Sequence, residues 1–173
     1  MTASTPDRLQ QLANLAVVAA SVAVIWFVWD KPARDIGRAE GYAVEDPMDP
    51  IDGVDFARNG STLLMMLRED CRFCQESIPF YKRLTTAVAH SASPHRIVVV
   101  STDPLERMSA YLGAAGVQVS HLAGVTPGQL RVPGTPMLLL VDNTGVVREA
   151  WRGKLNRAQE VEVLRALDLS DVD

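Results

Sequence analysis

Short apolar runs alternate with amphipathic stretches along the part of the chain that follows residue 60. Three continuous apolar runs, at 62–67, 96–101 and 137–141, are typical of strands that are buried on both faces of a sheet. A tight turn at Asp142–Gly145 leads into a fourth predicted strand, from Val146 to Trp151.

Between these runs, apolar residues recur at three- and four-residue intervals, which predicts helices. The first helix is expected over 71–88, and the second follows Asp103 as N-cap and Pro104 as first helical residue. The last follows Asn156, to which Gln159 can reach back. The predicted order is β-α-β-α-β-β-α. Because a βαβ start requires a right-handed crossover and a parallel pair, we expect an α/β fold with one four-stranded mixed sheet and helices on both faces.

A long apolar segment lies near the N-terminus. Leu12–Trp29 contains eighteen residues without a charge, and as a helix it would be about 27 Å long, close to the thickness of a bilayer's hydrocarbon core. Trp26 and Trp29 stand at one end, where aromatic rings favour the membrane interface. A cleaved signal peptide and a buried core helix are the alternatives. The length of the run and the absence of a small-residue cleavage site after it favour an uncleaved single-span anchor.

Four regions are therefore expected: an N-terminal tail (1–11), a transmembrane anchor (12–29), an acidic linker rich in Pro and Gly (30–60) and a folded domain (61–173). Five acidic residues lie between Glu45 and Asp55, and such a segment favours an extended, solvated conformation. A short strand near 54–56 could interrupt it.

Composition narrows the function. The formal charge is −4, which gives no reason to expect a nucleic-acid partner, because nucleic acid requires a basic face. The chain has two cysteines, Cys71 and Cys74, which can close a small disulfide ring, so the pair can store two electrons as a dithiol and release them as a disulfide. Half of a zinc site is the alternative, but the three histidines show no paired spacing. A c-type haem site would need histidine after the second cysteine, where Gln75 stands.

The cysteines lie in a wider motif. The sequence CRFC at 71–74 follows a predicted strand and opens a predicted helix, Pro79 comes five residues after the pair, and VPGTP at 132–136 precedes an apolar run. With these features the stretch 63–167 resembles the thioredoxin superfamily. It looks most like the membrane-anchored thiol–disulfide oxidoreductases of the TlpA/ResA type, whose spacing between the cysteines and the second proline is similarly long.

The resemblance implies roles for the motif residues. Cys71 and Cys74 would be catalytic, with Cys71 attacking a partner's sulfur and Cys74 resolving the mixed disulfide. The positions expected to contact a substrate are Arg72, Phe73, Thr135 and Pro136. The family's proline corresponding to Pro136 is cis, which places the Thr135 backbone beside the disulfide, and Pro79 kinks the active-site helix.

Position alone supports a reactive thiol at the start of this helix. Unpaired N–H groups and the helix dipole there favour the thiolate of Cys71 and lower its pKa. Arg72 should act in the same direction, whereas Glu69 and Asp70 should oppose it. We therefore leave open whether the protein reduces or oxidises its partners.

The chain also departs from the family pattern at three positions. Met65 occupies the place of thioredoxin's buried acid, Asp70 that of the usual tryptophan, and Ser77 that of a frequent glutamate. Proton transfer to Cys74 would then use water or another group.

The expected function is membrane-anchored exchange of electrons with cysteines of partner proteins and with an upstream donor or acceptor, for example during cytochrome c maturation. No cofactor beyond the Cys71–Cys74 disulfide, and no metal, is expected. The resemblance places the domain outside the cytoplasm, in the periplasm, although the charges flanking the span favour the opposite orientation. The alternatives are a peroxiredoxin-like peroxidase, which would want threonine where Arg68 stands, and a non-catalytic tethered binding module.

Overall fold

The computed structural model describes residues 41–58, 60–91 and 95–169, together with Asn14, Val17 and Ser21, which are helical. The rest of the predicted anchor, 12–29, lies outside the described residues. Among the helices that the structure does describe, none has the length and apolar character needed to cross a membrane. The folded domain occupies the described residues from 41 onward.

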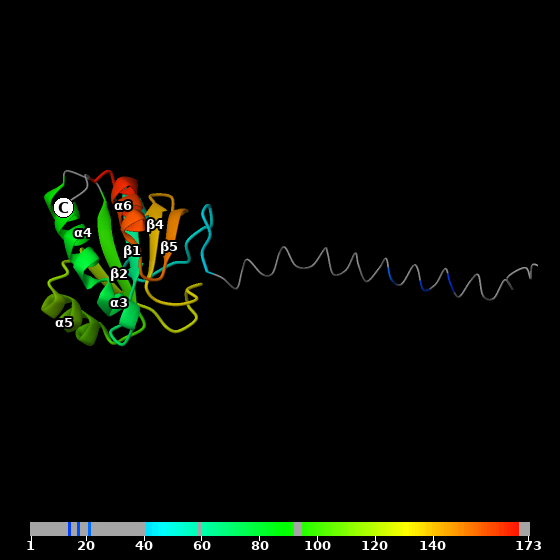
Figure 1. Ribbon diagram of the computed structural model, residues 1–173, viewed down its shortest axis with the longest axis horizontal. Coiled ribbons are helices and arrows are strands. Elements are labelled where there is room, and N and C mark those ends of the chain that lie inside the picture. The colour runs from blue at the N-terminus through cyan, green and yellow to red at the C-terminus, as the bar shows by residue number, and fades with distance from the viewer. Residues whose placement is uncertain are drawn as a thin grey trace, which may run out of the picture. The chain divides into compact units, whose positions relative to one another are not determined.

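A five-stranded mixed sheet forms the centre of this domain, in the order β3-β2-β1-β4-β5 (Figure 1). The strands are β1 (Ser61–Met66), β2 (Arg96–Ser101), β3 (His121–Gly124), β4 (Met137–Asp142) and β5 (Val147–Arg152). β1 pairs parallel with β2 and antiparallel with β4, and β3 is parallel to β2.

The prediction of four strands was wrong by one, because β3 carries little sequence signal. It has four residues, of which only Ala123 is buried, and it begins with His121 and ends with Gly124. Pairing with β2 holds it in the sheet, through the register Val98 to His121 and onward. Such an edge strand is formed by its neighbour's exposed backbone groups and not by its own apolar pattern.

The helices are α3 (Arg72–Glu76), α4 (Ile78–His90), α5 (Leu105–Ala115) and α6 (Arg157–Ala166). The single helix predicted over 71–88 is thus two helices, with Ser77 as the C-cap of α3 and the N-cap of α4. Pro79 lies in the first turn of α4, where its missing N–H would have no helical partner in any case. The active-site helix is thus interrupted at Ser77, two residues before Pro79.

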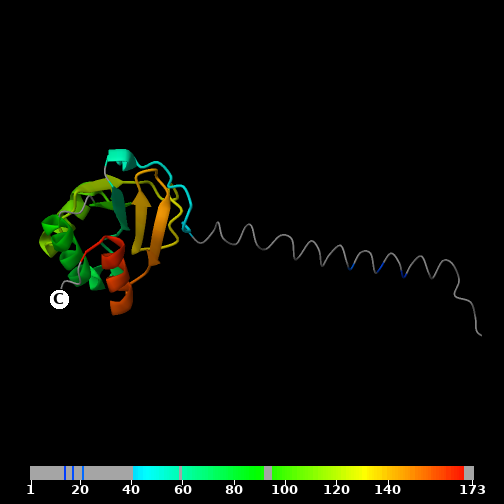
Figure 2. The ribbon, with the colours of Figure 1, turned by 90° about the horizontal axis from the view of Figure 1, so that it is seen from above.

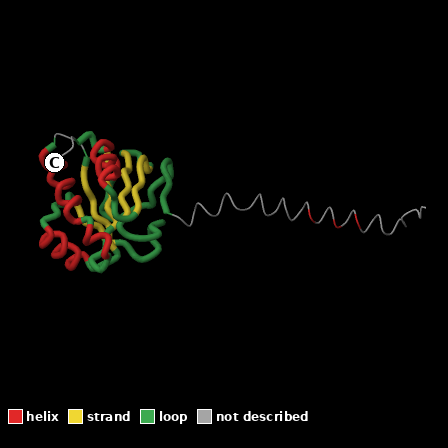
Figure 3. The backbone as a smooth tube through the Cα atoms, in the orientation of Figure 1, coloured by secondary structure: helices red, strands yellow, loops and turns green. Residues whose placement is uncertain are grey.

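All four helices pack on one face of the sheet (Figure 3), so the expectation of helices on both faces was wrong. The chain moves from β1 to β2 and then from β2 to β3 in the same direction across the sheet. Right-handed crossovers taken twice in one direction place both connecting helices, α4 and α5, on the same side. Leu63, Met65 and Leu67 face these helices, while Leu64 and Met66 face the other way.

Two irregular segments, 41–58 and 125–132, close the second face. Tyr42, Met48 and Ile51 are buried there, and Figure 2 shows the 41–58 segment, in cyan, on the side of the sheet away from α4 and α6. The N–H of Met48 donates to the carbonyl of Gly145 at 2.8 Å, so the segment also pairs with the β4–β5 hairpin. The prediction of a solvated linker over 30–60 is therefore wrong for 41–58. The strand suggested near 54–56 is a short 3-10 helix, Phe56–Arg58.

Of the two predicted N-caps, one is confirmed. Asn156 caps α6 in a capping box with Gln159. The N-cap of α5 is Pro104, which has no side-chain cap bond, so the cap predicted at Asp103 is wrong. The carboxylate of Asp103 instead accepts a hydrogen bond from the N–H of Glu69 at 2.7 Å.

Candidate functional site

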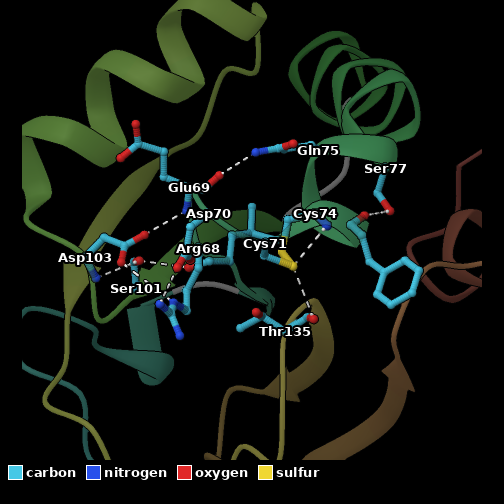
Figure 4. Close-up of a disulfide and its surroundings, with 12 residues drawn as sticks. Arg68, Glu69, Asp70, Cys71, Cys74, Gln75, Ser77, Ser101, Asp103 and Thr135 are labelled. Atoms are coloured by element: carbon cyan, nitrogen blue, oxygen red, sulfur yellow. Dashed lines mark hydrogen bonds and ion pairs between the residues drawn. A yellow bond between two sulfur atoms is a disulfide. The ribbon is translucent and has the colours of Figure 1, made fainter.

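Cys71 and Cys74 lie where β1 passes into α3, and they form a disulfide (Figure 4). Cys71 is the N-cap of α3, and the N–H of Cys74 lies 3.1 Å from its Sγ. Cys74 is fully buried in the core beneath the helices, whereas Cys71 is partly exposed. The two sulfurs therefore differ: one is accessible at a helix N-terminus and the other is enclosed one turn inward.

Thr135 lies beside this disulfide, as expected. Its carbonyl oxygen is 3.3 Å from Sγ of Cys71, a distance at which the reduced thiol can donate a hydrogen bond (Figure 4). The Thr135–Pro136 peptide bond is cis, as the resemblance implied. Distant segments meet here because β4 lies antiparallel to β1, with Met137 opposite Met66, so the start of β4 faces the end of β1.

Arg72 and Phe73 follow Cys71 on the surface of α3. Phe73 is 53% exposed, so a large apolar ring is open to solvent two residues after Cys71. The Nε of Arg72 bonds to Glu76 at 2.7 Å, and Glu76 also accepts from Lys154 at 2.9 Å. The hydrogen bonds from Lys154, and then from Arg72, lower the pKa of Glu76. Arg72 thus shares this one carboxylate with Lys154.

The two acids before Cys71 also have partners of opposite charge. Glu69 pairs with Arg107 at 2.5 Å, and Asp70 pairs with Arg68 at 2.8 Å. Each charged residue around the disulfide therefore has an opposite charge in contact with it. The helix N-terminus and the N–H of Cys74 are left as the local groups that favour a thiolate at Cys71.

A hydrogen-bond network that the sequence did not indicate holds the segment leading into Cys71. Ser101 Oγ donates to the carbonyl of Leu67 at 2.8 Å and accepts from the N–H of Asp103 at 3.1 Å. Gln75 Nε2 donates to the carbonyl of Glu69 at 2.8 Å (Figure 4). The sequence hinted at this network only through the polar residues Ser101 and Asp103 at the end of the second predicted strand. This end lies at the same edge of the sheet as the end of the first strand, because the two strands are parallel.

Two of the three positions that depart from the family pattern, Met65 and Ser77, are buried, whereas Asp70 is exposed. Met65 is fully buried in the same core as Cys74, so no carboxylate occupies this place behind the disulfide. Ser77 is also buried and donates to the carbonyl of Phe73 at 2.8 Å. Its hydroxyl is thereby engaged with the backbone of α3.

Metal chemistry finds no support at these cysteines. Within the residues that the structure describes, no three or more His, Cys, Asp or Glu side chains are grouped so that they could hold a metal ion.

Comparison with known proteins shows the fold. No protein-family model matches the chain, and no curated protein matches it. Solved structures do match: a thiol-disulfide isomerase from Corynebacterium glutamicum superposes with a TM-score of 0.53 at 15% identity, covering 78% of this chain and 98% of that one. The chain has a thioredoxin-like fold.

Two further structures show how widely this fold is shared. A putative thiol:disulfide interchange protein DsbE from Chlorobium tepidum has a TM-score of 0.54 at 21% identity, covering 74% of this chain and 97% of its own. A peroxiredoxin-like protein from Aquifex aeolicus also has a TM-score of 0.54, at 13% identity, with 73% and 88% covered. Interchange proteins and a peroxiredoxin-like protein both occur on this thioredoxin-like scaffold. The chemistry must therefore be argued from the site.

Proposed function

We propose that this protein is a membrane-anchored thiol–disulfide oxidoreductase that exchanges electrons with cysteines of other proteins. The observation that carries the proposal is the placement of Cys71: a partly exposed sulfur at the N-cap of α3, bonded to the buried Cys74 and 3.3 Å from the carbonyl of Thr135. No cofactor beyond this dithiol is needed for the reaction.

In the reducing direction, the thiolate of Cys71 attacks one sulfur of a partner disulfide, and the partner's other sulfur leaves as a thiolate and takes up a proton. Cys74 then loses its proton and attacks Sγ of Cys71. This step releases the second partner thiol and forms the Cys71–Cys74 disulfide. Two electrons and two protons pass to the partner, and an upstream dithiol restores the reduced pair. In the oxidising direction the same steps run in reverse.

The surroundings of the disulfide favour a polypeptide substrate. The backbone at Thr135 can pair with an extended segment of the partner in the manner of an added strand. The exposed ring of Phe73, two residues after Cys71 in the chain, offers an apolar contact. Because the charges around the site are paired, we expect recognition to depend more on backbone and apolar contacts than on net charge.

The test is exchange with a protein disulfide. Dithiothreitol reduces insulin disulfides slowly by itself, and the wild type should accelerate this reaction. Cys71→Ser should abolish the acceleration. Cys74→Ser should instead accumulate a mixed disulfide with the partner, which non-reducing electrophoresis detects. Full activity of the Cys71→Ser variant would refute the proposal. Peroxide consumption by the wild type, lost in Cys71→Ser, would instead support the peroxidase, for which the paired Arg68 stands where threonine is wanted.

Location is part of the proposal. We propose that residues 12–29 anchor the protein as a single span and that the folded domain lies outside the cytoplasm, where partner proteins form disulfides. A role in the maturation of cytochrome c or other exported proteins would fit this place. An alkaline phosphatase fusion after residue 173 should be active if the orientation is right and inactive if the domain is cytoplasmic.

A further inference from the structure

The loop that carries Thr135 packs against the sheet over only part of its inner side. A cavity of about 320 Å³ lies between residues 125–135 and the carboxyl ends of β1 and β2. Leu130 and Val132 of the loop line it, opposite Met66 and Val100 of the sheet. Leu130 packs into the apolar cluster on this face of the sheet, so the cavity leaves part of the loop's inner side without sheet contacts.

Arg131 ties the loop to the segment 41–49 on its other side. The guanidinium donates from Nη1 to Asp46 at 2.9 Å and from Nη2 to the carbonyl of Pro47 at 2.9 Å. Its Nε lies 3.5 Å from Asp49, and the group stacks 4.3 Å above the ring centroid of Tyr42. One side chain therefore makes four contacts with a segment more than 80 residues away, and the guanidinium geometry suits them all.

Tyr42 gives this contact a rigid base. The residue is fully buried, and its hydroxyl donates to Asp49 at 2.6 Å. Burial, and next the hydrogen bond to Asp49, raise the pKa of Tyr42 to about 12, so the hydroxyl remains a donor over the whole physiological range. Asp49 is thereby fixed where Arg131 reaches it.

A second contact lies closer to the site. The backbone at Gly41 passes directly against the ring of Pro133: a Cβ at Gly41 would stand 2.8 Å from Cδ of Pro133. Gly41 also has a φ of +95°, a conformation that favours glycine. Pro133 is two residues before Thr135, so the same segment touches the loop at two successive points on the approach to the disulfide.

We infer that Arg131 is a positioning residue of the redox site, which uses the segment 41–49 as an external brace to hold the Thr135 backbone beside Cys71. The kinetic part of this inference rests on the proposed function, since it assumes that the Thr135 backbone binds the partner polypeptide. The structural part does not.

Arg148 provides a matched control. It also ties the segment 41–58 to the domain, because it bonds to Glu45 of the segment at 2.6 Å and to Asp142 of β4 at 2.7 Å. It lies on β5, and its hydrogen bonds and ion pairs go to these two residues and not to the loop. Arg131→Met and Arg148→Met each remove an arginine that bonds to this segment. Only the first removes the brace of the loop.

The experiment compares both variants with the wild type in the full-length protein, by amide hydrogen exchange and by steady-state reduction of insulin. In Arg131→Met, exchange of the loop amides 126–135 should rise roughly tenfold or more, because local opening becomes easier. The KM for insulin should rise roughly threefold or more with a smaller change in kcat, because substrate binding and not chemistry is weakened. Arg148→Met should stay within about twofold of the wild type on both measures.

Two more variants keep the inference open to refutation. Arg131→Lys retains the charge but not the planar fork, so its effect should fall between those of Met and the wild type. If Arg131→Met does not fold, Tyr42→Phe keeps the ring and removes the bond to Asp49, and it should show the same changes at smaller size.

Equal loop exchange in Arg131→Met and Arg148→Met would overturn the inference, as would faster loop exchange with an unchanged KM. Failure of the proposed function is a different result: Cys71→Ser would stay active, while the exchange measurement would still report whether Arg131 braces the loop.

Discussion

Replacing Asp103 by alanine tests whether this carboxylate holds the segment before Cys71, as the structure shows, or caps α5, as the sequence suggests. The side chain accepts a hydrogen bond from the N–H of Glu69 at 2.7 Å and lies 3.8 Å from the guanidinium of Arg68. Glu69 is two residues before Cys71, so loss of this bond frees the approach to the redox site.

The magnitude follows from burial. A hydrogen bond to a charged acceptor contributes about 1.5–3 kcal/mol when it is buried. The Asp103 side chain keeps 16% of its surface exposed, so the lower part of that range applies, and the longer contact with the half-exposed Arg68 adds little. We expect Asp103→Ala to lose about 1–2 kcal/mol of unfolding free energy, which lowers Tm by roughly 4–8 °C in a domain of this size.

Thermal denaturation measures the total, and hydrogen exchange locates it. In Asp103→Ala, the Glu69 amide should exchange faster, while the first-turn amides of α5 keep their protection. Asp103→Asn serves as the control, because its amide oxygen can still accept from Glu69, and it should recover at least half of the lost stability. The reasoning would be refuted if Glu69 kept its protection and the first turn of α5 lost its own.

Two further predictions concern the β4–β5 turn and the start of α4. Partial burial alone would raise the pKa of the Asp142 carboxyl, but the hydrogen bonds from Thr144, Val146 and Arg148 outweigh it and hold this pKa well below its ordinary value. A depressed carboxyl pKa stabilises the fold above about pH 4, and this contribution is lost as the pH falls further. Asp142→Asn should therefore lower the unfolding free energy by about 1–2 kcal/mol at pH 7. Urea unfolding at pH 7 and pH 3 should show that this loss is smaller in acid. An equal loss at both pH values would contradict the depressed pKa of Asp142. Pro79→Ala should change the unfolding free energy by less than about 1 kcal/mol, because Pro79 occupies the first turn of α4. If urea denaturation showed that the variant is about 3 kcal/mol more stable, the proline would instead be interrupting one continuous helix.

Local patterns predicted the strands that matter most for the site. β1, β2 and β4 are buried on both faces, so each is a continuous apolar run that can be recognised without its neighbours. The capping box at Asn156 was predicted for the same reason, since all its atoms lie within one turn. β3 was missed because it depends on pairing with β2, and the packing of 41–58 was missed because its acidic residues conceal the few buried apolar ones.

The sequence by itself determined that two cysteines stand three residues apart at a strand–helix junction, and that a proline motif precedes a later strand. Only the tertiary structure decided what surrounds them. The contact between Cys71 and Thr135 spans 64 residues, and that between Arg131 and Asp46 spans 85. Spacing along the chain fixes geometry within a turn or a strand. Contacts over such separations depend instead on the order in which strands pair and on which face each segment covers, and these are properties of the assembled sheet.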